Sequence, residues 1–485
     1  MTRERAETVP CPLRAAAEAV PRSPALVDRD ETLSYAGLDH RVSVAASRLL
    51  DLGCRPGDRV ALYLPRDARE VVLLLALIRA GCVACPLSTR LPPRGVLRLL
   101  RRSGCSTMIS DDPEVSNAAG SAVRNLDPEG LFKDTTTNFR SSDTPQLRLN
   151  RPATVIFTSG SSGVPKAVLH TFGNHYYSAL GSNANIGLSP GDRWLLSLPL
   201  YHVAGLSILF RCLLAGAAAA LPEPEGNLAN SIADLKATHV SLVATQLRRL
   251  LRVGVEAKGL KAVLLGGGPA PGSLVGEASS RGLPVYTSYG LAEMASQVTT
   301  TPPDASGREL RTAGRVLPYR EVSISGTGEI LVRGETLFAG YVEGEEVDLP
   351  LDADGWFHTK DLGELDVEGR LIVRGREDNL FISGGENVQP EEIEAALERL
   401  KGVERAVVVP VPDEEFGERP AAFVQVADKD PRVDRLSGAL EEELPRYKIP
   451  VAFYRWPEEA DDGGMKVDRV FFKDLALRFY SDPQD

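Results

Sequence analysis

The sequence has few cysteines and a deficit of positive charge. Six cysteines in 485 residues are too few for a disulfide framework, and their scatter fits a reducing compartment. Cys82 and Cys85 have the spacing of a metal-ligand pair, but they lie in an apolar run that leads into Pro86, with no second Cys or His pair nearby. We therefore interpret this pair as packed core. The net charge of -11 disfavours a nucleic-acid partner, whose phosphates require cations.

An apolar leader and an uncharged membrane span are also missing. Residues 1–7 contain no apolar region of the kind found in secretory signals, so we expect a cytoplasmic protein. The most apolar segment, residues 203–221, carries Arg211 near its centre, where a charge costs about 2.5 to 3.5 kcal/mol on insertion. The segment is therefore predicted to be a buried helix. A buried guanidinium needs an anionic partner, which is either a protein carboxylate in a structural salt bridge or a ligand.

The length of the chain predicts more than one domain, because a single hydrophobic core stops growing well below 485 residues. Between Leu33 and Pro222, strand-like runs alternate with helical patterns, which indicates doubly wound α/β subdomains. Short alternating strands with glycine-rich turns between Arg315 and Arg374 predict a small β-barrel-like subdomain. The predicted strands are 59–64, 153–157, 240–243, 262–265, 283–286, 329–333 and 370–374, and a helix is expected at 68–80.

A separate α+β unit of about 110 residues is expected at the C-terminal end, within the usual range for a domain. It contains a predicted helix at 389–397 and a predicted strand at 406–409. We place the boundary so that residues 1–375 form the large domain and residues 376–485 the small one. The polar segment 111–150 is predicted to be a surface excursion, and the run Ala217 to Ala220 is interpreted as core helix.

The clearest chemical signal is the loop Thr158-Ser-Gly-Ser-Ser-Gly-Val-Pro-Lys166. Its glycines and hydroxyl residues let consecutive backbone N–H groups form an anion nest, and it follows a predicted strand. It is not a Walker A motif, because no Ser or Thr follows Lys166. A flexible connector is the alternative for such a loop considered alone, but the strand before it and the Pro-Lys pair after it favour a phosphate site. The phosphate-binding candidates are Thr158, Ser159, Gly160, Ser161, Ser162, Gly163 and Lys166.

This loop resembles the signature of the acyl-adenylate-forming superfamily, which includes acyl-CoA synthetases, adenylation domains and luciferases. The similarity extends over nearly the whole chain. Further matching segments are Pro199-Leu-Tyr-His202, Ser288-Tyr-Gly-Leu-Ala-Glu293, Gly355 to Gly363, Gly375-Arg-Glu-Asp378 and Met465-Lys-Val-Asp-Arg469. The resemblance implies ATP and Mg²⁺ as cofactors and coenzyme A as the co-substrate.

The resemblance also implies roles for individual residues. Lys466 would contact the α-phosphate and the attacking carboxylate, and Glu293 would hold magnesium, for which a carboxylate is a hard ligand. His202 would line the acyl pocket and gate it, and Asp378 would be the hinge of a mobile small domain. Adenine and ribose contacts fall to Gly266, Gly267, Gly268, Tyr289, Gly290, Asp361 and Arg376.

Three segments resemble the o-succinylbenzoate:CoA ligase branch of that superfamily: 202–211, 264–271 and 288–297. That acid has two carboxylates, and Arg211 is a suitable partner for the one that is not activated. Ser296 and Gln297 are predicted to line the same pocket. Two alternatives within the family are another aryl- or acyl-CoA ligase and an adenylation enzyme that serves a carrier protein. An alternative of another class is an inactive nucleotide sensor, because Ala292 and Met465 depart from the family pattern.

Overall fold

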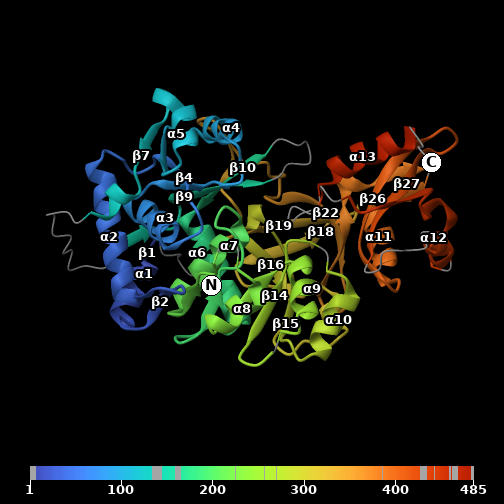
Figure 1. Ribbon diagram of the computed structural model, residues 1–485, viewed down its shortest axis with the longest axis horizontal. Helices are drawn as coiled ribbons and strands as arrows, with labels where there is room; N and C mark the ends of the chain where they lie inside the picture. The colour runs from blue at the N-terminus through green and yellow to red at the C-terminus, as the bar shows by residue number, and fades with distance from the viewer. Residues whose placement is uncertain are drawn as a thin grey trace.

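The computed structural model describes residues 7–133, 145–158, 165–223, 226–255, 257–268, 270–384, 386–426, 434–441, 443–457, 460 and 468–481. Two large mixed sheets with their helices make up the N-terminal part of the molecule. The elements α11, α12, α13, β26 and β27 lie together at the opposite end from α1 and α2 (Figure 1). The predicted fold class is confirmed: a large α/β domain, a small β-barrel-like subdomain and a small α+β domain.

The first large sheet carries the end of the predicted phosphate loop. Its central strands are parallel, and β10, β20 and β21 extend one edge in antiparallel orientation. In sheet order the strands are β21 (Glu346–Asp348), β20 (Gly340–Glu343), β10 (Lys166–Thr171), β9 (Pro152–Thr158), β5 (Val83–Pro86), β4 (Arg59–Tyr63), β6 (Thr107–Ser110) and β7 (Arg124–Leu126). The helices near them in sequence are α2 (Tyr35–Asp51), α3 (Ala68–Ala80), α4 (Pro93–Ser103) and α5 (Pro113–Ala119).

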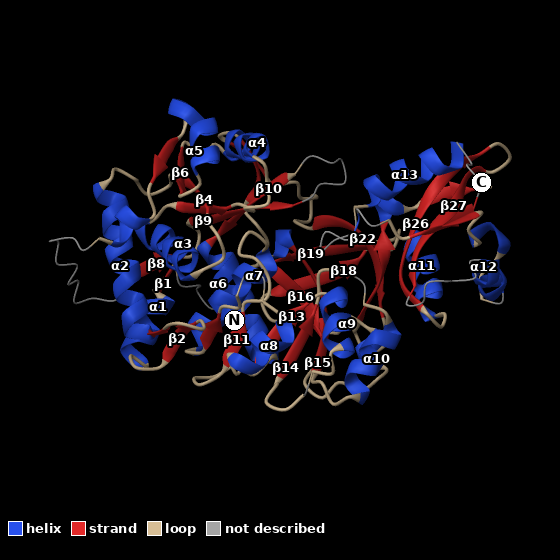
Figure 2. Ribbon diagram, in the orientation of Figure 1, coloured by secondary structure: helices blue, strands red, loops and turns tan. Residues whose placement is uncertain are grey.

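The second large sheet is parallel in its middle and antiparallel at both edges. In sheet order its strands are β17 (Arg315–Val316), β16 (Ser296–Thr300), β15 (Val285–Leu291), β14 (Ala262–Leu265), β13 (His239–Leu242), β11 (Arg193–Leu195), β12 (Ala218–Ala220), β2 (Pro24–Val27) and β3 (Thr32–Ser34). Its helices are α6 (Phe172–Asn185), α7 (Val203–Ala215), α8 (Leu228–Asp234), α9 (Ala244–Arg252) and α10 (Gly272–Ser280). Figure 2 shows α9 and α10 beside β14 and β15.

Two smaller sheets complete the path to the C-terminal end. The β-barrel-like subdomain is an antiparallel sheet of β18 (Arg320–Ile324), β19 (Glu329–Gly334), β22 (Phe357–Leu365) and β23 (Leu371–Arg376). The last sheet contains β25 (Glu386–Val388), β24 (Phe381–Ser383), β27 (Gly417–Val426), β26 (Val403–Asp413) and β28 (Ala452–Arg455), with α11 (Pro390–Arg399), α12 (Asp434–Glu441) and α13 (Arg469–Ser481). A separate pair joins β1 (Thr8–Pro10), which precedes α1 (Pro12–Ala19), to β8 (Gln146–Arg148).

Local signals explain where the predicted helices begin and end. The side chain of Asp67 accepts from two backbone N–H groups at the start of α3, and Gly81 ends that helix in the left-handed conformation. Pro390 opens α11 without the loss of a helical hydrogen bond, and Glu391 and Glu392 follow it in the first turn, where the helix dipole favours negative charge. The proposed boundary after residue 375 falls within β23, and it stays a prediction.

Several expectations needed correction. The run Ala217 to Ala220 is not helix: Gly216 ends α7 in the left-handed conformation, and Ala218–Ala220 forms β12 between β11 and β2. Alanine favours helix, but the interior of a parallel sheet demands small or apolar strand residues here, and all four alanines are almost fully buried. The segment 111–150 contributes α5, β7 and β8 rather than only a surface loop. The strand predicted at 283–286 runs from Val285 to Leu291.

The remaining predictions about buried segments are confirmed in full or in part. Cys82 and Cys85 are fully buried in the apolar core, as their sequence context predicted. The buried helix predicted at 203–221 is confirmed over residues 203–215, which form α7 and contain Arg211, but not over its last residues, where β12 lies. Among the described residues, no helix combines the length and the apolar character that crossing a membrane requires.

Candidate active site

The phosphate loop is closed by a pair of strands. Thr158 ends β9 and Lys166 begins β10, and the two residues pair directly across the antiparallel ladder. Residues 159–164 lie outside the described residues, so the positions of Ser159, Gly160, Ser161, Ser162 and Gly163 stay predictions. The ammonium group of Lys166 lies 4.6 Å from the ring centroid of Tyr341, which β20 places next to β10. A cation over an aromatic face is electrostatically favoured.

The same tyrosine contacts the predicted magnesium ligand. The Tyr341 hydroxyl donates a 2.7 Å hydrogen bond to Oε1 of Glu293. Burial and the neighbouring Glu293 carboxylate raise the pKa of Tyr341, so the phenol keeps its proton. The backbone carbonyl of Glu293 accepts from the N–H of Phe338 at 2.8 Å, which fixes the short helical turn at 292–294. Glu293 is therefore oriented at both its backbone and its side chain.

Two buried histidines lie next to the turn at 292–294, and one of them, His170, contacts it directly. Nε2 of His170 donates to the carbonyl oxygen of Ala292 at 2.7 Å, because a carbonyl can only accept. Thr154 lies between His170 and His175, with its hydroxyl 2.7 Å from Nε2 of His175. Burial lowers the pKa of His170 to about 4, and it lowers the pKa of His175 well below its ordinary value. Both rings are therefore neutral near pH 7.

A second polar chain runs from the β15 strand to the predicted hinge. The Tyr289 hydroxyl donates to Oδ2 of Asp361 at 2.6 Å, and Nη1 of Arg376 donates to Oδ1 of the same carboxylate at 2.8 Å. Arg376 and Lys360 each contact Asp378 at 3.2 Å. Partial burial raises the pKa of Asp378, but these two cations outweigh it and the net pKa lies below its ordinary value. Asp378 is therefore a carboxylate held by two cations.

Glycines allow close backbone approach beside Tyr289. Gly266 follows β14, and its N–H donates to the carbonyl of Leu242 at 3.1 Å. Gly267 and Gly268 therefore lie just beyond the carboxyl ends of parallel strands. At Gly290, a Cβ atom would lie only 2.3 Å from the carbonyl oxygen of Ser296. No other residue fits there without displacement of the strand.

Helix α7 carries Arg211 into the interior. The helix begins directly after His202, whose ring lies 4.7 Å from that of Tyr201. Gly205 lies in its first turn, and a Cβ atom there would lie 2.1 Å from the carbonyl oxygen of Pro199. The first turn of α7 thus packs directly on the backbone of the preceding loop.

Arg211 is 1% exposed and contacts only uncharged groups among the described residues. Its Nη2 donates to Oγ of Ser296 at 3.0 Å and to Oε1 of Gln297 at 2.8 Å. Its guanidinium carbon lies 4.9 Å from the ring centroid of Trp194. Neither Nε nor Nη1 has a hydrogen-bond partner within the described part of the chain. The structural salt bridge considered from the sequence is therefore not formed with any described carboxylate.

The structure groups the predicted residues into three contact sets. In the first set, Lys166 and Glu293 both contact Tyr341. The second set consists of Tyr289, Asp361, Arg376 and Asp378. In the third set, Arg211 contacts Ser296 and Gln297. Lys466 lies outside the described residues. Sequence reasoning missed Tyr341, Trp194, His170 and Lys360, because each is distant along the chain from the residue it contacts. Lys360 lies within the matching segment Gly355 to Gly363, and no local motif marks the other three.

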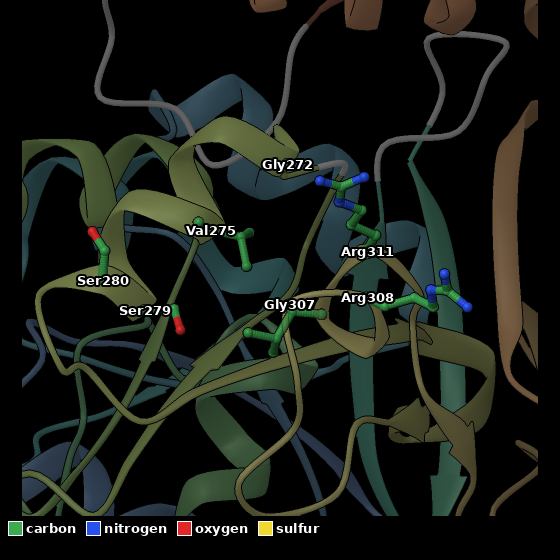
Figure 3. Close-up of a pocket in the computed structure, with 9 residues that line it drawn as sticks. Gly272, Val275, Ser279, Ser280, Gly307, Arg308 and Arg311 are labelled. Carbon is green, nitrogen blue, oxygen red and sulfur yellow. The ribbon is translucent and has the colours of Figure 1, made fainter.

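A separate hollow of about 500 Å³ lies between α10 and the turn at 309–311 (Figure 3). Its lining includes Val275, Ser279 and Arg311, and it contains none of the residues in the three contact sets. It is a surface feature distinct from the candidate site.

Family models match both parts of the chain. One model, described as AMP-binding enzyme, matches residues 13–342, and another, described as AMP-binding enzyme C-terminal domain, matches residues 392–460. The chain belongs to the AMP-binding enzyme family and is an adenylate-forming ligase.

The chain is similar to proteins whose names share one substrate. It is 35% identical to the 2-succinylbenzoate–CoA ligase of Bacillus licheniformis, over 94% of this chain and 98% of that protein. An arginine-to-lysine variant of E. coli MenE with bound OSB-AMS superposes with a TM-score of 0.85 at 32% identity, and the match covers 97% of this chain and 98% of that one. The o-succinylbenzoate coenzyme A synthetase of Bacillus subtilis in complex with ATP and magnesium ion has a TM-score of 0.84 at 33% identity, with 93% and 96% covered.

Proposed function

We propose that this ligase joins o-succinylbenzoate to coenzyme A in menaquinone biosynthesis, with ATP as the activating substrate. The observation that carries the proposal is Arg211, a fully buried guanidinium with two unpartnered nitrogens and no described carboxylate beside it. Burial of an uncompensated charge is costly, so a ligand anion that reaches it binds with unusual strength. The similarity to 2-succinylbenzoate–CoA ligases supports an acid with a second carboxylate.

The nucleotide would occupy the surface formed by the other two contact sets. We assign Thr158, Lys166 and the loop between them to the phosphates of ATP, Tyr289 and residues 266–268 to adenine, and Asp361 with Arg376 to the ribose. The carboxylate of Glu293, already oriented by Tyr341, has the hard oxygen donors that suit Mg²⁺. When bound there, the ion would neutralise charge on the phosphates.

The chemistry requires no nucleophilic side chain. An oxygen of the substrate carboxylate attacks the α-phosphorus of ATP, and pyrophosphate leaves with the electrons of the broken P–O bond. The thiol of coenzyme A then attacks the acyl carbon, loses its proton, and AMP leaves. The protein supplies position and positive charge, from Lys166 and, by family resemblance, from Lys466. We assign Asp378 as the hinge by which a mobile domain of residues 376–485 serves both steps.

The proposal is tested by measurement of AMP formation in the presence of ATP, magnesium and coenzyme A. We expect kcat/KM with o-succinylbenzoate to exceed that with benzoate or a fatty acid by roughly 10- to 100-fold, the typical effect of one charged hydrogen bond in a buried site. Equal activity with a monocarboxylate would contradict the choice of substrate. Faster transfer to a phosphopantetheinylated carrier protein than to coenzyme A would contradict the choice of acceptor.

Pyrophosphate exchange distinguishes an enzyme from a nucleotide sensor. We expect acid-dependent exchange that disappears in Lys466→Ala. Tight ATP binding without exchange would instead support the sensor. We also infer a cytoplasmic location, because all six cysteines are free and buried.

A further inference from the structure

A second arginine is buried close to the first. Arg320 opens β18 and is 6% exposed. Its Nη1 donates to the carbonyl of Pro318 at 2.7 Å, and its Nη2 lies 3.1 Å from both the carbonyl oxygen and Oγ of Ser178. Its Nε has no hydrogen-bond partner within the described ranges.

Helix α6 makes room for this guanidinium. A Cβ atom at Gly181 would lie 2.3 Å from Nη1 of Arg320, so this turn of the helix accepts the arginine only because position 181 is glycine. Ser178 lies three residues before Gly181 and four before Ser182, so its side chain neighbours both positions on the helix surface. The face is thus shaped around a charged side chain.

Hydrogen bonds connect this face to the residues around Arg211. The hydroxyl of Ser178 donates to the carbonyl of Ala295 at 2.9 Å, and that of Ser182 donates to Oε1 of Gln297 at 2.7 Å. The same Gln297 oxygen accepts from Arg211. The two arginines therefore hold opposite ends of one buried polar network that contains residues 295–297.

Neither arginine forms an ion pair with a carboxylate of the described chain. Burial lowers the pKa of Arg211 to about 9. Burial lowers the pKa of Arg320 to about 9 as well, and the charge of Arg211 contributes to that shift. Both remain charged near pH 7. Two neighbouring buried cations without an anion repel each other, and an incoming carboxylate removes part of that repulsion.

We infer that Arg320 is a specificity-determining positioning residue of the acid pocket. It supplies a second positive charge behind Arg211 and holds Ser178 and residues 295–297 in place, so that the pocket favours an acid with a second carboxylate. This inference rests on the proposed function, because it assigns Arg211 to that carboxylate. The alternative is that Arg320 only joins β18 to α6, through its contacts with Pro318 and Ser178, and has no influence on the choice of acid.

The test compares two acids in three variants. Arg320→Gln should raise KM for o-succinylbenzoate about tenfold, because it removes one of the two buried cations that favour the second carboxylate. Its kcat should change less than about twofold, and KM for benzoate should stay the same or fall. Arg320→Lys should keep most of the preference, because it keeps the charge. The matched control is Arg374→Gln, which removes an exposed arginine from β23 of the same sheet.

The outcomes separate this inference from the proposed function. If the wild-type protein shows no preference for the second carboxylate, the proposed function fails on that measurement and the inference fails with it. If the wild type shows the preference and Arg320→Gln retains it, only the inference is overturned. Equal losses with both acids, together with a lower melting temperature, would identify Arg320 as a structural tie and also overturn the inference.

Discussion

The hydroxyl of Tyr341 donates a hydrogen bond of 2.7 Å to the carboxylate of Glu293. The face of the same ring lies 4.6 Å from the ammonium group of Lys166. A single side chain from β20 therefore contacts both the end of the phosphate loop and the candidate magnesium ligand. Ala292, the residue before this glutamate, has no hydroxyl, and Tyr341 provides a hydroxyl to the glutamate from another strand.

Removal of the Tyr341 hydroxyl should weaken magnesium binding at Glu293. In Tyr341→Phe we expect the magnesium concentration for half-maximal pyrophosphate exchange to rise about tenfold, because groups that orient a metal ligand typically contribute that much to metal affinity. A titration of exchange rate against magnesium measures the shift. Tyr480→Phe, at an exposed tyrosine of α13, is the control. An unchanged magnesium requirement in Tyr341→Phe would show that Glu293 needs no such support.

Replacement of Arg211 should lower activity without lowering thermal stability. Arg211→Met should lower kcat/KM for o-succinylbenzoate by roughly 10- to 100-fold, the typical effect of a lost charged hydrogen bond. Its melting temperature should stay equal or rise, because the substitution removes an uncompensated buried charge. Thermal unfolding and steady-state kinetics of the same preparation measure both quantities. A large fall in melting temperature would indicate instead that Arg211 serves mainly to hold the fold.

Contacts between α9 and β26 should limit the separation of the C-terminal elements from the second large sheet. Arg252 pairs with Glu404, and Arg248, one turn earlier, lies near Glu398 and Glu404. Arg252→Glu should speed protease cleavage between β23 and α11 by up to about fivefold, the typical range for a partly exposed ion pair. The double variant with Glu404→Arg should restore the original rate. If cleavage is equally fast in the single and double variants, the pair does not hold the two parts together.

Acid should destabilise the protein through its buried histidines. Burial holds the pKa of His170 near 4, whereas an ordinary histidine titrates near 6.5. The unfolded chain therefore binds more protons between these values, and stability falls as the pH drops from 6.5 towards 4, by about 1.4 kcal/mol per pH unit for each such group. Urea unfolding at several pH values measures the slope. His170→Gln should reduce that slope, whereas His40→Gln, at an exposed position, should leave it unchanged.

Hydrophobic patterning predicted most elements near the site, because strands such as 262–265 are short apolar runs bounded by turn residues. The alanine run at 217–220 was misread because its strand pairing with β11 and β2 depends on residues far along the chain. Arg211 was identified early for a different reason. A charge within an apolar run conflicts with local expectation, and such conflicts often mark functional positions.

Tyr341 and Arg320 could not be found in this way. Each lies in a β-strand of ordinary composition, and each acquires its role only from tertiary neighbours, Glu293 for Tyr341 and α6 for Arg320. Prediction from one sequence identifies residues that conflict with their local surroundings. It does not identify residues whose importance depends on what the fold places beside them.

Gly205 affects the position of Arg211 although it lies six residues before it in α7. The helix begins so close to the carbonyl of Pro199 that even one methyl group at position 205 would have to push it away. Arg211 is rigidly joined to that first turn by less than two turns of helix, so any outward shift at Gly205 would move the guanidinium away from Ser296 and Gln297. The position of the Arg211 guanidinium therefore depends on a missing methyl group six residues earlier in the same helix.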